Sequence, residues 1–168
     1  WDGALWLSLR LPLLLADLAV LLTLLRWFPD RPRRVLVHWW ASPIVFYVTY
    51  VHGQLDLLPT ALFLASTAHI TDGRLRRAGV LFGLAAATKL HVLAGLPFLA
   101  LYLLRAPHRS ARPLRDVAAF LGPAVAVATL LLAPMLPSEG YRAMVFGSPE
   151  MAKVLTLALP LGDGLQVY

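Results

Sequence analysis

Long apolar runs alternate with short polar stretches along this chain, and the first run is the clearest. Residues 4–28 are apolar almost throughout. At about 1.5 Å per residue, a helix of this length can cross the roughly 30 Å hydrocarbon core of a bilayer. The pattern therefore predicts a membrane-spanning helix at the start of the chain.

Further apolar runs follow at the intervals expected of a protein that crosses the membrane several times. Spans are predicted over 35–51, 57–70 and 116–136, and together with the first they make residues 1–136 a transmembrane helix bundle. We predict that residues 137–168 form an external segment that is cut short. The expected fold class is therefore all-α, a polytopic helix bundle.

The apolar run 78–104 has basic clusters at both ends, which a single crossing does not explain. Cytoplasmic loops carry an excess of Lys and Arg, so one crossing would put one cluster on the wrong side of the membrane. We therefore predict a broken-helix hairpin with arms at 78–88 and 92–104, which enters and leaves from the cytoplasmic face. The sequence "TKLH" lies at its apex. The basic residues that mark the cytoplasmic face are Arg26, Arg31, Arg33, Arg34, Arg74, Arg76, Arg77, Arg105, Arg109, Arg112 and Arg115.

Small residues recur every four positions along the first arm of this hairpin. They are Gly79, Gly83 and Ala87, which lie on one face of a helix. Such a ridge allows two helix backbones to approach closely in a membrane. The spacing therefore predicts tight packing of this arm against another helix.

Composition agrees with a membrane protein. The 168 residues are 59% hydrophobic and 14% charged, against about 25% charged in soluble domains. The net charge of +6 does not indicate a nucleic-acid partner, because the basic residues sit in clusters between apolar runs without interleaved aromatics. The absence of cysteine excludes a disulfide framework and a cysteine-based metal site. We interpret the chain as a fragment of a longer polytopic protein.

Two ionisable residues lie well inside the first span, away from Arg26 near its end. Arg10 and Asp17 are seven residues apart and share one helix face. Charged side chains inside a membrane usually face the bundle interior or a watery cavity. They could form an intramembrane charge pair or contact neighbouring helices, or they could be the wall of a substrate cavity.

The stretch "YVHGQLDLLP" puts three polar side chains between two apolar runs. In one interpretation it is a turn in which Asp56 caps the following helix. In the other, His52, Gln54 and Asp56 form a polar site. His52 and Asp56 could also be half of a metal site, but the sequence supplies no third ligand, so it does not support a metal or another cofactor.

Lys89 and His91 lie at the apex of the predicted hairpin. A lone lysine in a buried place must lose its proton or find an anion. Lys89 could reach a nearby surface or pair with Asp17 or Asp56. Alternatively, it could bind an anionic group of a ligand, such as a lipid phosphate, with help from His91.

Aromatic residues cluster on either side of Pro43, in "HWW" and in "FYVTY". We interpret them mostly as packing or lipid-facing residues. Tyr47 and Tyr50 lie near the predicted external interface, where aromatic belts are common.

The order of these motifs resembles the integral-membrane GT-C glycosyltransferases. The likeness is strongest to bacterial polyprenyl-phosphomannose-dependent mannosyltransferases and to eukaryotic glucosyltransferases that extend the dolichol-linked oligosaccharide, and it covers roughly residues 8–135. Those enzymes carry a basic residue, a proline and an acid in one span, then a Ser/Asn-Pro, then a His/Gly-x-Gln-x-Asp element, then an "AG…K" hairpin. The matching positions here are Arg10, Pro12, Asp17, Ser42, Pro43, His52, Gly53, Gln54, Asp56, Ala78, Gly79, Lys89 and Pro97.

The resemblance implies transfer of a mannose-like hexose from a polyprenyl-phosphate donor to a lipid- or protein-linked acceptor. The reaction would take place on the non-cytoplasmic face of a bacterial inner membrane, with inversion at the anomeric carbon. Lys89 would contact the donor phosphate, and His52, Gln54 and Asp56 would line the sugar or acceptor site. The general base would lie in an external loop upstream of Trp1, so we expect the catalytic residue to be absent and this fragment alone to be inactive.

Two other classes of protein share part of this pattern. Broken helices with polar apices also form the substrate sites of transporters and lipid-handling membrane proteins, although those often show a second, matching broken segment. A membrane scaffold without catalytic activity is the third alternative.

Overall fold

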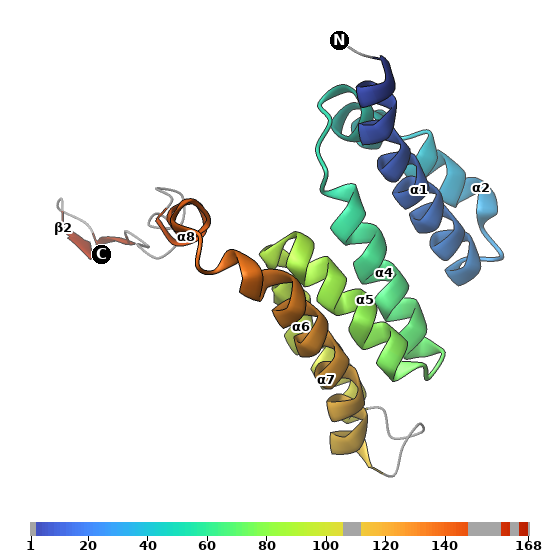
Figure 1. Cartoon of the computed structure of the whole chain (residues 1–168). Helices are drawn as coiled ribbons and strands as arrows, with labels where there is room; N and C mark the ends of the chain where they lie inside the picture. Colours follow the sequence, from blue (N-terminus) through green and yellow to red (C-terminus); the bar gives the residue numbers. More distant parts are fainter. Residues whose placement is uncertain (1–2, 106–111, 148–158, 162–164, 168) are drawn as a thin grey trace. The chain divides into compact units, whose positions relative to one another are not determined.

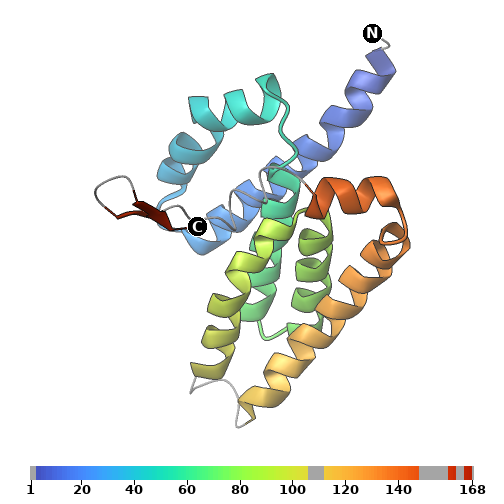
Figure 2. The same ribbon diagram turned by 90° about the vertical axis from the view of Figure 1, so that its left-hand side faces the viewer.

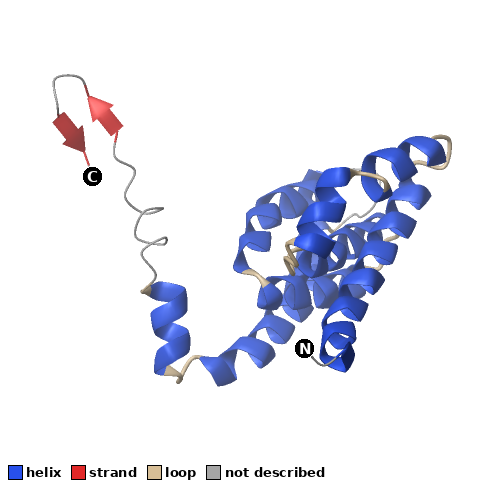
Figure 3. Cartoon of the chain, turned by 90° about the horizontal axis from the view of Figure 1, so that it is seen from above, coloured by secondary structure: helices blue, strands red, loops and turns tan. Residues whose placement is uncertain are grey.

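A computed structural model of the chain describes residues 3–105, 112–147, 159–161 and 165–167. The chain divides into two compact units, Trp1–Thr129 and Leu130–Tyr168, which are treated separately below. Arg109 and much of the segment predicted as external lie outside the described residues. Helices dominate the described part, in agreement with the predicted fold class (Figure 3).

The first unit consists of helices joined by short turns (Figure 1). The α-helices are α1 (Gly3–Trp27), α2 (Pro32–Val35), α3 (Pro43–Phe46), α4 (Leu57–Thr71), α5 (Leu75–Thr88), α6 (Leu96–Arg105) and α7 (Pro113–Leu132). A π-helical stretch follows α2 over Leu36–Trp40, another follows α3 over Tyr47–Val51, and a 3₁₀ stretch precedes α6 over Leu90–Gly95.

The span predicted over 35–51 is not one continuous helix, because the chain breaks between Trp40 and Pro43. Ser42 has an extended backbone (φ −70°, ψ 119°), and α3 begins at Pro43. Proline disfavours the helical region for the residue before it and has no N–H to donate, so the helix cannot continue through this dipeptide. The segment is therefore two short helical arms with a hinge between them.

Helices α4 to α7 run up and down, as Figure 2 shows. Gly73, with a φ of +76°, makes the tight turn from α4 to α5. The helix then breaks at Lys89, whose backbone is extended (φ −154°, ψ 119°), and α6 returns. As a result, the end of α6 and the start of α7 lie at the same end of the unit as the α4–α5 turn (Figure 2). This is the arrangement that the broken-helix hairpin predicts.

Close backbone contact joins α5 to α7. A Cβ on Gly83 would lie 2.5 Å from the carbonyl oxygen of Ala124, and one on Gly79 would overlap the carbonyl oxygen of Phe120. Phe82, between the two glycines, packs its ring edge-on against Phe120 with centroids 5.4 Å apart. The predicted tight packing is confirmed at these two glycines.

A second apolar cluster joins α1 to α4. Leu13, Ala16 and Val20 of α1 pack against Leu57 and Ala61 of α4. The other faces of α1 remain apolar and exposed, with leucines at positions 11, 14, 15, 18 and 22 about half accessible. A helix that is apolar on its outside as well as its inside is typical of a protein surrounded by lipid.

Among the described residues, one helix is long and apolar enough to cross a membrane, over Pro113–Met135. Helix α1 is of comparable length, 25 residues, but carries Arg10, Asp17 and Arg26. The number of crossings therefore stays a prediction.

The second unit contains a helix and a small hairpin. A 3₁₀ turn (Ala133–Met135) leads to α8 (Glu139–Phe146), where Ser138 accepts the N–H of Tyr141 at 3.3 Å as an N-cap. Strands β1 (Leu159–Leu161) and β2 (Leu165–Val167) pair antiparallel, with Leu159 opposite Val167. This hairpin departs from the predicted all-α fold in the part of the chain that the structure describes.

Candidate functional site

A buried carboxylate on α1 holds both arms of the broken segment. Asp17 is 2% exposed, and its Oδ1 accepts the indole N–H of Trp39 at 2.9 Å. Its Oδ2 accepts the indole N–H of Trp40 at 3.2 Å and the hydroxyl of Tyr50 at 2.7 Å. We call these four residues the Asp17 cluster. A buried charge without partners is very costly, and three donors at hydrogen-bond distance offset that cost here.

Arg10, which is also on α1, contacts the second arm of the same segment near its end. Its guanidinium donates to the backbone carbonyl of Thr49 at 3.3 Å and to that of Tyr50. Those carbonyls lie near the end of a helical arm, where acceptors lack intrahelical partners. Arg10 and Asp17 thus both bind a neighbouring helical segment, which is one of the alternatives drawn from the sequence.

A pocket of about 470 Å³ opens beside the Asp17 cluster. Asp17, Trp40 and Tyr50 provide its polar atoms, and the rest of its lining comes from Leu14, Val45 and Phe46. Asp17 therefore does lie in the wall of a cavity, although its oxygens already accept three hydrogen bonds from protein groups.

The polar loop begins directly after the second arm. Gly53 has a φ of +74°, a conformation that favours glycine, and it lies between the second arm and α4. The His52 ring is exposed and stacks on Tyr47 with centroids 6.4 Å apart. Gln54 is exposed as well, and its N–H donates to the carbonyl of Val48 at 3.1 Å.

The prediction that Asp56 caps α4 is wrong. Its side chain makes no capping hydrogen bond, since its own backbone is helical (φ −63°, ψ −19°) rather than extended as in an N-cap. The carboxylate instead forms an ion pair with the ammonium group of Lys89. This pair joins the start of α4 to the apex of the hairpin.

The Asp56–Lys89 pair is open to its surroundings. The side chain of Lys89 is 51% exposed and that of Asp56 is 41% exposed. His91, two residues beyond the break at Lys89, is also exposed. We call the loop 52–56 together with Lys89 and His91 the apical site. In the described residues no three His, Cys, Asp or Glu side chains come close enough to hold a metal ion.

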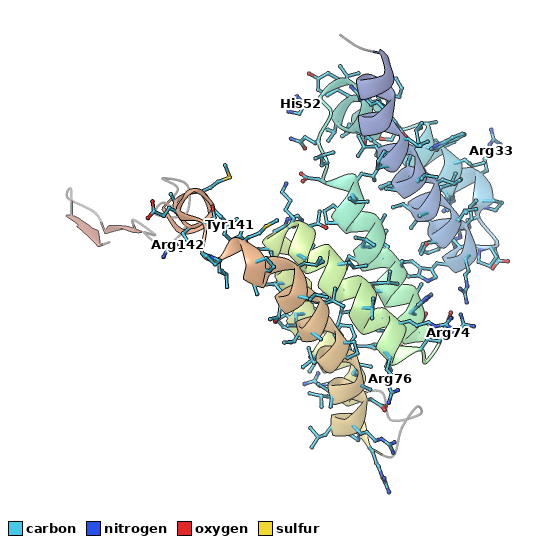
Figure 4. The ribbon with its side chains drawn as sticks, viewed as in Figure 1. Arg33, His52, Arg74, Arg76, Tyr141 and Arg142 are labelled. Atoms are coloured by element: carbon cyan, nitrogen blue, oxygen red, sulfur yellow. The ribbon has the colours of Figure 1, made fainter. Side chains whose placement is uncertain are left out.

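The apical site and the arginine-rich turn lie at opposite ends of the first unit. Figure 4 shows His52 at one end and Arg74 and Arg76 at the other. At that second end Arg26, from the last turn of α1, forms a 2.7 Å ion pair with Asp72 in the α4–α5 turn. The end of α1 therefore lies beside the α4–α5 turn, in line with the prediction that Arg26 and Arg74 mark the same end.

Sequence reasoning missed Trp39, Trp40 and Tyr50 as polar partners. The sequence pattern predicts packing or lipid-facing roles for these aromatics. The available signal was Asp17 itself, because a buried acid needs donors and an indole or phenol supplies one from an apolar surface.

Comparison with known proteins identifies the class of protein. The model of glycosyltransferase family 87 matches residues 2–156, which is most of the chain. The chain therefore belongs to glycosyltransferase family 87, a membrane family of the GT-C type, as the resemblance implied. No curated protein and no solved structure matches it. Membership implies a sugar donor and an acceptor in general terms.

Proposed function

We propose that this chain is part of a multi-pass glycosyltransferase of the bacterial inner membrane. It moves a mannose-like hexose from a polyprenyl-phosphate donor to a lipid- or protein-linked acceptor on the non-cytoplasmic face. The observation that carries the proposal is the Asp56–Lys89 pair at the hairpin apex, at the end opposite the arginine-rich turn.

Lys89 is the donor-phosphate ligand in this proposal. A half-exposed ammonium whose counterion is a half-exposed carboxylate can exchange that carboxylate for a phosphate oxygen at little cost, because both groups already meet solvent. His91, which is exposed two residues further on, would add a donor to the same phosphate in this proposal.

The loop residues would line the sugar or acceptor. His52 and Gln54 present exposed polar groups on the same loop as Asp56, and Asp56 becomes free to accept a sugar hydroxyl once Lys89 binds phosphate. Transfer would proceed with inversion, and the general base would come from an external loop that precedes residue 1. No metal or other cofactor is part of this proposal.

Family membership favours the transferase over the transporter. A transporter would use the broken helices to expose the apical site alternately to both faces. Close contact between α5 and α7 at Gly79 and Gly83 instead holds the first arm of the hairpin tightly against its neighbour.

The test uses the full-length protein in membranes supplied with a labelled polyprenyl-phosphate sugar. We expect Lys89→Ala to lower transfer about 100-fold, as removal of an anion-stabilising donor does elsewhere, and Lys89→Arg to retain part of it. The matched control is Arg26→Ala, which removes the basic partner of Asp72 at the opposite end of the unit and should leave transfer within about twofold.

Equal activity in Lys89→Ala and Arg26→Ala would overturn the phosphate role. Full transfer after combined Gln54→Ala and Asp56→Asn substitution would show that the loop is only a turn.

A further inference from the structure

The hinge at Ser42–Pro43 leaves the two arms of the broken segment without a continuous helical ladder. Pro43 has no N–H, and Ser42 is extended, so the backbone alone does not set the angle between the arms. The second arm leads directly into the loop 52–56. A change in the angle between the arms would therefore move the loop 52–56 relative to Lys89.

One side chain from a different helix spans this hinge. Asp17 accepts hydrogen bonds from Trp39 and Trp40 on the first arm and from Tyr50 on the second. The donors on the two arms are thus held within hydrogen-bond distance of one carboxylate group. Because Asp17 is 2% exposed and sits on the 25-residue helix α1, the carboxylate is itself a fixed point.

Helix α1 also holds the far end of the second arm. Arg10 donates to the carbonyls of Thr49 and Tyr50, two to three residues before the loop begins at His52. Its guanidinium also approaches Gly53, since a Cβ there would lie 3.9 Å from Nη2. Helix α1 therefore holds the second arm at two points, the phenol of Tyr50 and the backbone carbonyls of Thr49 and Tyr50.

Apolar contacts then connect α1 to the rest of the site. Leu13, Ala16 and Val20 pack on Leu57 and Ala61 at the start of α4, directly after Asp56. Helix α1 thus positions the segments on both sides of the loop 52–56. The loop 52–56 begins at an arm fixed by Asp17 and ends at a helix fixed by this cluster.

We propose that Asp17 is a positioning residue for the transfer reaction. It clamps the two arms of the broken segment through the Asp17 cluster and thereby holds the loop 52–56 opposite Lys89. It does not touch the substrate in this role, because its oxygens are occupied by three protein donors. The proposal rests on the proposed function for its kinetic consequence, but its geometric consequence can be measured independently.

The geometric test places spin labels on either side of the apical site. Leu55 and Leu93 are exposed and belong to the loop and to the hairpin, and each is replaced by Cys in full-length protein stripped of any other cysteine. We expect a narrow distance distribution between the labels, which broadens in Asp17→Asn and stays narrow in Asp72→Asn. Asp72 is the matched control because its carboxylate also receives a side chain of α1, at the opposite end of the unit.

The kinetic test separates positioning from chemistry. We expect Asp17→Asn to raise the KM about tenfold, the equivalent of one hydrogen bond to a charged group, while kcat changes less than about threefold. Tyr50→Phe should show the same KM effect more weakly, and the double variant should be no worse than Asp17→Asn alone. Such non-additivity is expected only when Asp17 acts through Tyr50.

Three outcomes would overturn the proposal. They are an unchanged distance distribution in Asp17→Asn, a loss confined to kcat, and strictly additive effects in the double variant. If Asp17→Asn does not fold, Trp40→Phe and Tyr50→Phe, which keep the carboxylate and loosen one arm each, give the same test. Failure of the parent protein to use a polyprenyl-phosphate sugar would refute the proposed function alone, since the label distances would still decide the clamp.

Discussion

Two interruptions of helical structure shape the first unit, and they are stabilised in opposite ways. At Ser42–Pro43 the hinge is spanned by hydrogen bonds from two arms to the buried carboxylate of Asp17. At Lys89 the break ends in a half-exposed ion pair, and the first arm is held by the glycine contacts between α5 and α7.

The difference shows which break can lose its side-chain contacts without loss of structure. All the polar atoms of the Asp17 cluster contribute to holding the backbone, so a ligand that displaced them would release the hinge. Lys89 and Asp56 contribute little to holding the backbone at the second break, because exposed ion pairs contribute about 0–1 kcal/mol to the free energy of unfolding. In the proposed function, their charges would therefore be available to a substrate.

The largest expected effect is on the glycine contact that supports the break at Lys89. We expect Gly79→Leu to destabilise the protein by about 3 kcal/mol or more, because its side chain would have to displace the backbone of α7 at Phe120. Denaturant titration in mixed micelles measures this. Gly122→Ala on α7 is the control, since nothing lies within 4 Å of its Cβ position, and it should be neutral or slightly stabilising. Similar losses in both variants would mean that α5 and α7 do not touch there.

An intermediate effect is expected from removal of one donor in the Asp17 cluster. Trp39→Phe keeps an aromatic ring but leaves Oδ1 of Asp17 without its indole partner, which should cost about 1.5–3 kcal/mol. Denaturant titration in mixed micelles measures this loss of stability as well. Trp40→Phe, which removes the longer 3.2 Å bond from a more exposed ring, should cost less. The reverse order would show that the cluster does not depend on burial.

The smallest effect on stability is expected at the Asp56–Lys89 pair. Asp56→Asn should change the free energy of unfolding by less than about 1 kcal/mol, because both side chains are about half exposed. Transfer activity measured on the same preparation should nevertheless fall strongly. A stability loss as large as that of Trp39→Phe would make this pair a structural element like the first break and would remove the distinction between them.

Local signals along the sequence predicted much of the helical organisation. Alternating apolar runs placed α4 and α5 close to their observed bounds, and the arginine clusters implied a hairpin with Lys89 at its turn. These features depend on residues near one another in the chain. By contrast, Ser42–Pro43 was noted only as a family motif, although a proline after a polar residue also predicts a break.

The candidate site was harder to predict because its contacts span long stretches of chain. Helical spacing put Arg10 and Asp17 on one face, but it carried no information on which segment that face meets. Tyr50 reaches Asp17 across 33 positions, and Lys89 reaches Asp56 across the same number. Asp56 had a local alternative, the cap on α4, and the tertiary ion pair prevailed over it.

The length of helix α4 also bears on how deep Lys89 would lie in a membrane. It is bracketed by two acids, Asp56 before it and Asp72 after it, and each pairs with a basic side chain from another element. The 16-residue step from Asp56 to Asp72 puts these two acids about 24 Å apart along the helix, which is less than the roughly 30 Å of hydrocarbon in a bilayer. If the Arg26–Asp72 pair lies at the cytoplasmic interface, Lys89 lies several ångströms below the opposite one. A lipid-linked phosphate would then have to descend from the headgroup plane into a recess to meet it.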